Sequence, residues 1–331
     1  MLNVRAARSH RATPMTPNQI DAAEAEAGEE AAARKRLATL PGFSVESAAT
    51  ARFARLVGMT NRVWKVATGG GVFCLRLPGS GAAALIDRSI EERNARLAAE
   101  AGVAPEVLYF GNDGVMLTRF VAGTPLLPGE LARGEGAIDR VAAALRRLHE
   151  SGVEFAGKFQ AFATIESYKS ILERHGRKLS KQERDAVQEV RAIEEALVAH
   201  PSTLNPCHCD PTGRNLIDTG ERVWLVDWEY SGMNDPMWDL AYFSIESRFE
   251  EGGDVQLLNA YFGRRLRRAE VARVMALKPV AEVQAALWAL IQDVEGNTGG
   301  DFNAYAKATF ARATERLANP RLHESLRTLR P

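Results

Sequence analysis

The sequence predicts an α+β protein of two lobes, with a small sheet-rich lobe followed by a larger and mainly helical one. A chain of 331 residues exceeds the usual size of a single hydrophobic core. Hairpin signals gather in the first 120 residues, whereas helical periodicity dominates the rest, apart from one ribbon within 208–230. We therefore predict an N-terminal extension and helix at 1–40, a small lobe at 41–122 and a large lobe at 123–331.

The helices and strands of the small lobe are predicted from changes in hydrophobic periodicity and from turn residues along the chain. Residues 18–39 are rich in Ala and Glu, which predicts a helix. Two β-branched and aromatic runs around Thr-Gly-Gly-Gly predict antiparallel strands at 62–68 and 72–77. Residues 88–101 have a helical period and are followed by a glycine, and a turn at Asn-Asp-Gly makes 105–123 a second hairpin.

The large lobe is predicted mainly from helical periodicity. Apolar residues recur on one face of 136–150, and Ser180 with Glu183 forms a capping box before a helix at 181–199. The exception is a stretch in which Asn-Leu-Ile-Asp and Val-Trp-Leu-Val-Asp flank Thr-Gly-Glu-Arg, a pattern typical of a two-stranded ribbon. Further helices are predicted at 164–175, 254–263, 268–275, 279–293 and 302–318.

Composition argues against several classes of partner. The 42 Lys and Arg residues balance the 42 Asp and Glu residues, so no overall field favours nucleic acid. The N-terminus has no apolar signal region, and no uncharged apolar run reaches the roughly 18 residues of a membrane span. We expect a cytoplasmic protein, a monomer or homodimer, with a small-molecule substrate. Cys74, Cys207 and Cys209 are expected to be reduced and inert, because Cys-His-Cys lacks a second zinc-spaced pair.

The ribbon carries oxygen-bearing side chains at its ends. Asp227 follows the buried run Val-Trp-Leu-Val, and Asn215 stands at the facing end of the other strand. A carboxylate and an amide oxygen are hard ligands suited to Mg²⁺ held partly by substrate phosphates. Asp210, in the preceding loop, would orient a hydroxyl and accept its proton. The alternative is that all three are ordinary turn residues.

The spacing of these residues carries a resemblance. His208, Asp210 and Asn215 form His-x-Asp-x-x-x-x-Asn, and Asp227 begins Asp-Trp-Glu where protein kinases have Asp-Phe-Gly. The stretch resembles the loops of protein-kinase-like phosphotransferases, in the variant of aminoglycoside phosphotransferases and choline kinases. The resemblance implies a bilobal protein-kinase-like fold, with an ATP-binding lobe at 41–122 and a catalytic and acceptor-binding lobe at 123–331. It also implies ATP and Mg²⁺ as cofactors, Asn215 and Asp227 as metal ligands and Asp210 as catalytic base. It places His208 in the catalytic loop, more often as a structural histidine than as a proton carrier, and implies that Asp239 holds that loop.

Other segments resemble the choline/ethanolamine kinase family in particular, from about Leu56 to Tyr305. Gly-Met-Thr-Asn-Arg-Val is similar to that family's nucleotide loop, and Arg76 stands where protein kinases have their phosphate-binding lysine. The glutamate that pairs with Arg76 is either Glu91 or Glu92, with Glu91 favoured. The nucleotide site implied by the resemblance comprises Thr60, Asn61, Arg76, Glu91, Glu92, Thr118, Arg119 and Phe120.

The resemblance also implies a pocket for a cationic alcohol. A quaternary ammonium has no N–H to donate, so aromatic faces and a carboxylate recognise it best. Glu246 falls at the family's acidic position, and Trp288 and Tyr305 at two aromatic ones, although either aromatic could be ordinary core. A third aromatic position is Ala285, and Glu229 is counted among the substrate-binding residues.

Choline is the expected acceptor and ethanolamine the runner-up. Thiamine or an aminoglycoside remains open, because an acidic pocket suits every cationic alcohol. A pseudokinase that binds a nucleotide without turnover is the alternative from another class of protein.

Overall fold

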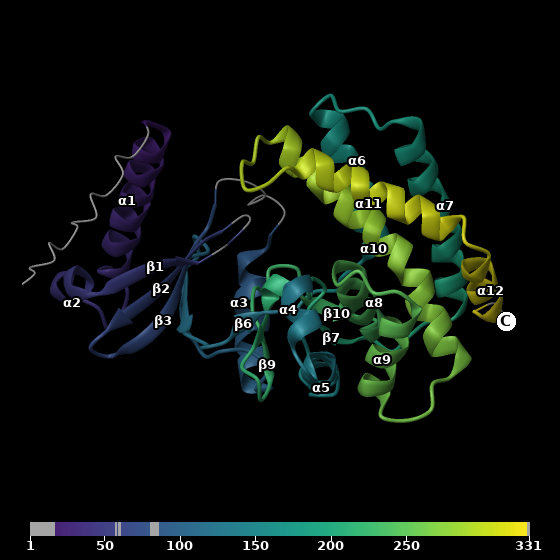
Figure 1. The fold of residues 1–331 in the computed structure, drawn as a ribbon, viewed down its shortest axis with the longest axis horizontal. Coiled ribbons are helices and arrows are strands. Elements are labelled where there is room, and N and C mark those ends of the chain that lie inside the picture. Colours follow the sequence, from purple (N-terminus) through teal and green to yellow (C-terminus); the bar gives the residue numbers. More distant parts are fainter. Residues whose placement is uncertain (1–16, 57, 59–60, 80–85, 330–331) are drawn as a thin grey trace, which may run out of the picture.

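The described residues form two lobes, as the sequence predicts (Figure 1). A computed structural model describes residues 17–56, 58, 61–79 and 86–329. A small antiparallel sheet lies at one end of the molecule, and helices fill the other end. The α+β architecture of a sheet lobe followed by a mainly helical lobe is therefore confirmed.

The small lobe is a five-stranded antiparallel sheet in the order β1-β2-β3-β5-β4. The predicted hairpin is present, and its turn contains Gly71 at a φ of 136°, which a residue with a Cβ rarely adopts. The second hairpin turns at Gly114, whose φ is 79°. The strands are β1 (Arg52–Leu56), β2 (Arg62–Thr68), β3 (Gly71–Leu77), β4 (Val107–Phe110) and β5 (Met116–Arg119).

One face of this sheet has a hydrophobic core of its own. Trp64, Leu75 and Leu117 are buried on that face, where Ala33 and Leu37 from the last turns of the first helix pack against them. Alternation along β3 places the intervening residues on the opposite face, towards the other lobe. The helices of this lobe are α1 (Pro17–Leu37), α2 (Val45–Thr50) and α3 (Arg88–Glu100).

The large lobe is built around one long buried helix, α10, which packs against α6, α8, α11 and α12. Most of the predicted helices are present within a few residues of their expected ends, and the capping box of Ser180 and Glu183 is confirmed. The helices of this lobe are α4 (Pro128–Arg133), α5 (Ala137–His149), α6 (Ala161–Arg174), α7 (Lys181–Ala199), α8 (Pro236–Glu246), α9 (Glu251–Phe262), α10 (Arg268–Val294), α11 (Phe302–Leu317) and α12 (Pro320–Thr328).

The two helices predicted at 268–275 and 279–293 are wrong as separate elements, because α10 continues through Pro279. Proline removes one helical hydrogen bond and crowds the preceding turn, which made it a reasonable boundary. Here Leu277, Pro279 and Val280 are all buried among the surrounding helices. Tertiary packing on every side therefore outweighs the local preference to break.

The sequence analysis did not predict α8, which later proves to carry part of the site. Positions Met237 to Ile245 are all buried, so the helix has no polar face and no amphipathic period to detect. Its remaining signal is at the N-terminus, where Asp235 caps the helix and Pro236 is the first helical residue.

Helix α10 is the one helix, within the part of the chain that the structure describes, long and apolar enough to cross a membrane by length and composition. Its most apolar window is 89% buried inside the lobe. It also carries Lys278 and Glu282, both buried and both paired with other side chains. The helix is accordingly the core of the large lobe.

The predicted ribbon is present and is joined by a third short strand in the order β6-β8-β9. The turn before β8 approaches the chain at Leu126 so closely that a Cβ at Gly213 would lie 2.1 Å from the Leu126 carbonyl oxygen. Glycine is therefore required where the chain bends towards the site. The short strands are β6 (Thr124–Pro125), β7 (Asn205–Cys207), β8 (Leu216–Asp218), β9 (Val223–Leu225) and β10 (Gly232–Asn234), and β7 pairs with β10.

Candidate active site

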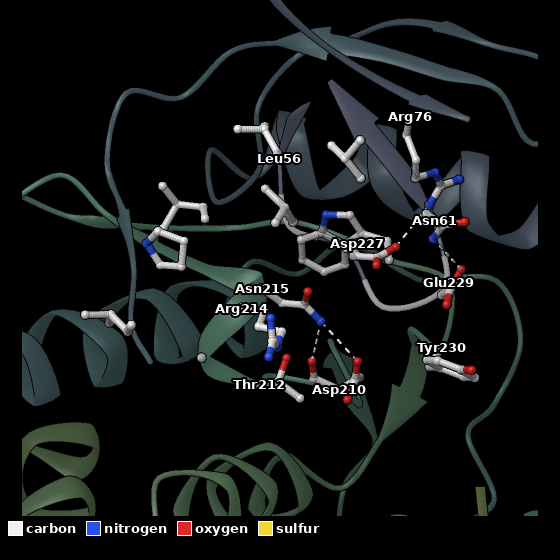
Figure 2. Close-up of a pocket in the computed structure, with 18 of the residues that line it drawn as sticks. Leu56, Asn61, Arg76, Asp210, Thr212, Arg214, Asn215, Asp227, Glu229 and Tyr230 are labelled. Carbon is white, nitrogen blue, oxygen red and sulfur yellow. Dashed lines mark hydrogen bonds and ion pairs between the residues drawn. The ribbon is translucent and has the colours of Figure 1, made fainter. Parts of the chain in front are cut away.

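A cavity of about 680 Å³ lies between the two lobes. Arg76 and Asn61 enter it from the small lobe, and Asp210, Asn215 and Asp227 enter it from the large lobe, as Figure 2 shows. The residues that the sequence singled out are therefore brought together, although 151 positions separate Arg76 from Asp227.

Asp239 of α8 holds the loop that leads to Asp210. Its two carboxylate oxygens accept the backbone N–H groups of His208 and Cys209, each at 2.8 Å. His149 of α5 approaches the same carboxylate with Nε2 at 3.0 Å. Cys209 has a φ of 67°, a left-handed conformation in a residue with a Cβ, so the loop is held in a strained shape by these contacts.

His208 lies behind the catalytic loop and does not line the cavity, which corrects its placement among the catalytic residues. The side chain is fully buried. Its Nε2 donates to the carbonyl oxygen of Val226 at 2.9 Å, and its Nδ1 accepts the N–H of Asp210 at 3.3 Å. Burial lowers the pKa of the imidazole. A neutral histidine thus ties the loop of Asp210 to the strand before Asp227.

Asp210 and Asn215 contact each other directly. The Asn215 side-chain amide donates to both the carbonyl and the carboxylate Oδ2 of Asp210, each at 3.0 Å (Figure 2). Burial raises the pKa of the Asp210 carboxyl, and the nearby carboxylates of Asp227 and Glu246 raise it further. Tyr242 donates a hydrogen bond that opposes this shift. The cavity therefore concentrates negative charge around Asp210.

Asp227 follows β9 in a strained conformation, with a φ of 67°. The N–H of Val226 donates to the carbonyl of Asn215 at 3.0 Å, which ties together the two ends of the ribbon. Arg76 donates to Oδ1 of Asp227 at 3.0 Å. Burial raises the pKa of Asp227, and Arg76 partly offsets that effect. The predicted convergence of Asn215 and Asp227 is what the structure shows.

The partner of Arg76 in α3 is Glu91. Both side chains are almost completely buried, and Arg88 contacts the second carboxylate oxygen of Glu91 at 2.6 Å. Glu92 lies one position further round the helix and pairs with Arg96 at 2.8 Å, so the alternative assignment of Glu92 is wrong. The helix register, which the sequence left open, is thus settled by which carboxylate reaches β3.

Asn61 and Glu229 meet across the lobes. The Asn61 amide donates to Oε2 of Glu229 at 3.4 Å, and a Cβ at Gly58 would lie 2.3 Å from the Asn61 carbonyl oxygen, so the chain turns tightly here. Thr60 lies outside the described residues. Burial and the adjacent Asp227 raise the pKa of Glu229 to about 8. Glu229 therefore lies next to Asp227 and Asn61, in the same cavity as the predicted acceptor residues.

The end of β5 lines another wall of the cavity. Thr118, Arg119 and Phe120 all face it, and the N–H of Phe120 donates to the carbonyl of Val72 at 3.1 Å. Apolar side chains complete this wall, among them Leu56 and Met116.

At the other end of the cavity lie the three predicted acceptor residues. The Tyr305 hydroxyl donates to Oε1 of Glu246 at 2.8 Å, and the Trp288 indole N–H donates to the hydroxyl of Tyr230 at 3.1 Å. All four residues line the cavity, as does Ala285. A carboxylate bonded to a tyrosine is thus present in the same cavity as Trp288, with Ala285 rather than an aromatic residue in the lining.

Sequence reasoning missed three tyrosines that line this end. Tyr230 is adjacent to Glu229, and Tyr242 lies one helical turn before Glu246, a spacing that would have pointed to it had α8 been predicted. Tyr168 comes from α6 and is 4% exposed. No local signal marks Tyr168, because only the packing of α6 against α10 brings it to the cavity.

The donor set fits a divalent cation. Because the Asn215 amide nitrogen donates to Asp210, its oxygen is turned away from that residue and is available as a ligand. The carboxylates of Glu91, Asp227 and Glu229 offer oxygens within 4.8 Å of one another. Burial is the main cause of the raised pKa of Asp210, Asp227 and Glu229, and neighbouring carboxylates raise each pKa further. Closely spaced hard oxygen ligands of this kind are suited to Mg²⁺.

A buried Arg–Glu pair in a sheet lobe, facing two acidic loops across a cleft, defines a phosphotransferase of the protein-kinase-like class. A sequence profile of the choline/ethanolamine kinase family matches residues 54–253 of the chain. The chain belongs to the choline/ethanolamine kinase family.

Relatives with solved structures share the fold over most of the chain. A choline/ethanolamine kinase family protein from Mesorhizobium loti is 41% identical and superposes with a TM-score of 0.81, covering 91% of this chain and 98% of that protein. The choline kinase LicA from Streptococcus pneumoniae has a TM-score of 0.73 at 24% identity, covering 88% and 99% of the two chains. Protein LicA of Haemophilus influenzae is 29% identical over 256 residues, 75% of this chain and 94% of LicA.

Proposed function

We propose that the protein transfers the γ-phosphoryl group of ATP to the hydroxyl of choline, with ethanolamine as the next acceptor. One observation carries the proposal: Asp210, Asn215 and Asp227 share a single cavity with a carboxylate and aromatic pocket around Glu246. The first group of residues suits phosphoryl transfer, and the second suits a small cationic alcohol.

At the nucleotide end, the base rests against the wall that includes Thr118 and Phe120. Arg76 is held in place by Glu91 and neutralises phosphate charge. Asn215 and Asp227 hold Mg²⁺, which when bound supplies positive charge to the transferring phosphoryl group.

At the acceptor end, Glu246 and the faces of Trp288 and Tyr305 hold the ammonium group. Asp210 then lies where it can accept the proton of the attacking hydroxyl, and the Asn215 amide fixes the orientation of its carboxylate. Holding both reactants in one enclosed site supplies much of the rate increase, because the attack becomes effectively intramolecular. His208 and Asp239 position this loop without touching the reactants.

There are three alternatives: two other acceptors, an aminoglycoside and thiamine, and a pseudokinase without activity. An aminoglycoside carries several ammonium groups and would need more carboxylates than Glu246 and Asp210 at this end of the cavity. Thiamine has one cationic ring and would suit the aromatic walls. A pseudokinase is disfavoured because the proton acceptor and both metal ligands face the same cavity.

Release of ADP in the presence of Mg²⁺ tests the proposal directly. Choline, ethanolamine, thiamine and kanamycin are compared at equal concentration, with EDTA as the metal-free control. We expect the highest kcat/KM for choline and no turnover with EDTA. A clear preference for thiamine or kanamycin would overturn choline as the acceptor. If none of the four alcohols led to ADP release, the result would favour the pseudokinase.

We also propose that the protein is cytoplasmic and is a monomer or homodimer. A cytoplasmic enzyme fits a substrate pair of ATP and a soluble alcohol. Light scattering after gel filtration distinguishes the expected monomer or homodimer from larger assemblies.

Replacing Trp288 by alanine is expected to raise the KM for choline about tenfold, because a cation–π contact is lost. The KM for ATP should stay within about twofold, since the nucleotide wall is built from other residues. Trp224→Ala is the matched control, as Trp224 lies on the ribbon and does not line the cavity. Equal changes in both KM values would mean that Trp288 is only a packing residue.

A further inference from the structure

An arginine occupies a position at the end of α8 where glycine is the usual residue. Ser247 is the C-cap, and the next residue, Arg248, has a φ of 59°. The N–H of Phe249 donates back to the carbonyl of Ser244 at 3.0 Å, and that of Arg248 to Ile245 at 3.2 Å. This hydrogen-bond pattern is the Schellman motif, whose left-handed residue is most often glycine because a Cβ is crowded there. Arg248 therefore adopts a backbone conformation that is strained for a residue with a Cβ.

The side chain of Arg248 lines the acceptor end of the cavity. It lies two residues after Glu246 and is solvent-exposed, as expected of a residue at the mouth. Among the described residues its guanidinium has no hydrogen-bond or ion-pair partner, whereas most arginines around the cavity are paired. A strained position, a free charge and a place at the cavity mouth together indicate a role other than stability.

The neighbouring charges do not neutralise Arg248. Arg312 of α11 lies close enough that burial and the charge of Arg248 both lower its pKa. Arg312 contacts Glu282 at 3.4 Å, and Arg316 contacts the same carboxylate at 3.0 Å, so one glutamate serves two arginines. Arg248 therefore stands at the mouth with its positive charge unpaired among the described residues.

The interior of the same cavity has the opposite sign. Asp210 and Glu246 face the acceptor end, and the pKa of Asp210 is raised by burial and by its carboxylate neighbours. A cation that enters is attracted to the interior. A second cation on the same molecule, a few bonds away, would be left beside Arg248 at the mouth.

We propose that Arg248 is a specificity-determining residue that limits the acceptor to alcohols with a single positive charge, by repelling a second cation at the cavity mouth. The inference rests on the proposed function, because it assumes that the acceptor enters through this end. Like charges placed side by side discriminate strongly between ligands that are otherwise similar. The class of acceptor is then a compact monocationic alcohol, and polycationic alcohols are excluded.

The test uses two choline analogues of matched shape and the full-length protein. In the first, one N-methyl group is replaced by a 3-(trimethylammonio)propyl arm, which adds a second permanent charge. In the second, the arm is 4,4-dimethylpentyl, which has the same shape and no charge. We expect the wild type to show about tenfold lower kcat/KM for the dication than for the neutral-arm analogue at low salt. The difference should shrink near 1 M salt, where the Debye length is about 3 Å.

Variants at position 248 identify the residue responsible. Arg248→Gly should bring the two kcat/KM values together, Arg248→Lys should keep most of the difference, and Arg248→Glu should reverse it. Arg265→Gly removes the same charge from a loop away from the cavity and should leave the wild-type ratio. Arg248→Gly should also unfold at a temperature at least as high as the wild type, since glycine suits a φ of 59°.

Dissociation constants of both analogues, measured with a non-hydrolysable ATP analogue present, separate this inference from the proposed function. A wild type that binds the neutral-arm analogue more tightly than the dication, yet releases no ADP from ATP with choline, would refute the kinase activity and leave the charge filter standing. Phosphorylation of choline with an unchanged ratio in Arg248→Gly would overturn the filter alone. Equal binding of the two analogues by the wild type would overturn it as well.

Discussion

Replacing Asp210 by asparagine is expected to lower kcat about 1000-fold while the dissociation constant for ATP changes by no more than about threefold. General base catalysis is worth about 10²- to 10⁴-fold, and asparagine cannot accept the proton. Asparagine still offers an oxygen to the Asn215 amide, which lies 3.0 Å from the present carboxylate, so the loop should keep its shape. Steady-state ADP release and calorimetric titration with ATP measure the two quantities.

The stability of this variant provides an internal check. Burial and nearby carboxylates raise the pKa of Asp210, so the ionised form weakens folding at neutral pH and the loss of its charge should not lower Tm. Asp218→Asn is the matched control, because Asp218 lies on the same ribbon, pairs with Arg140 and does not line the cavity. Full turnover in Asp210→Asn would remove Asp210 from the mechanism. A large fall in ATP affinity would show that its role lies in binding.

Replacing Arg76 by alanine is expected to reduce both stability and activity. The substitution leaves Asp227 without its 3.0 Å partner and Glu91 with Arg88 alone, deep inside the protein. Breaking a buried ion pair from one side typically destabilises by about 3–5 kcal/mol. The loss of a positioned cation at the phosphates should lower kcat by a further 10²- to 10³-fold. Thermal unfolding and ADP release at a temperature well below Tm measure the two effects separately.

Two further variants show whether burial explains the size of the effect. Arg76→Lys keeps the charge but offers a single ammonium group in place of a planar fork, so we expect intermediate losses. Arg36→Ala removes an arginine from the exposed pair with Asp113, which bridges α1 and the β4–β5 turn, and should cost less than about 1 kcal/mol. A similar Tm for Arg76→Ala and Arg36→Ala would contradict the view that Arg76 neutralises a buried acidic cluster.

The sequence by itself determined the parts of this protein that depend on short-range spacing. Asp210, Asn215 and Asp227 lie within eighteen positions on one loop and ribbon, so their mutual geometry is set almost locally. The hairpins of the small lobe and the capped helix at 181–199 depend on turn and cap residues that act over a few positions. Periodicity and motif spacing carry such information directly.

Long-range packing decided the remainder. Helix α8 has no polar face, and α10 continues through Pro279 because its surroundings are apolar on all sides. The choice of Glu91 over Glu92 depends on the rotation of α3 relative to β3, and a rotation of one residue turns a side chain by about 100°. Pattern alone could not resolve any of these three points.

The acceptor end depends on tertiary structure most of all. Tyr168 reaches it from α6, and Arg248 faces it only because α8 ends in a left-handed turn. The loop that holds Asp210 turns His208 away from the cavity, although the two residues are separated by a single position. The residues proposed for phosphoryl transfer could thus be predicted from residue types and spacing. The walls of the acceptor pocket could not, because they come from helices whose packing depends on the whole fold.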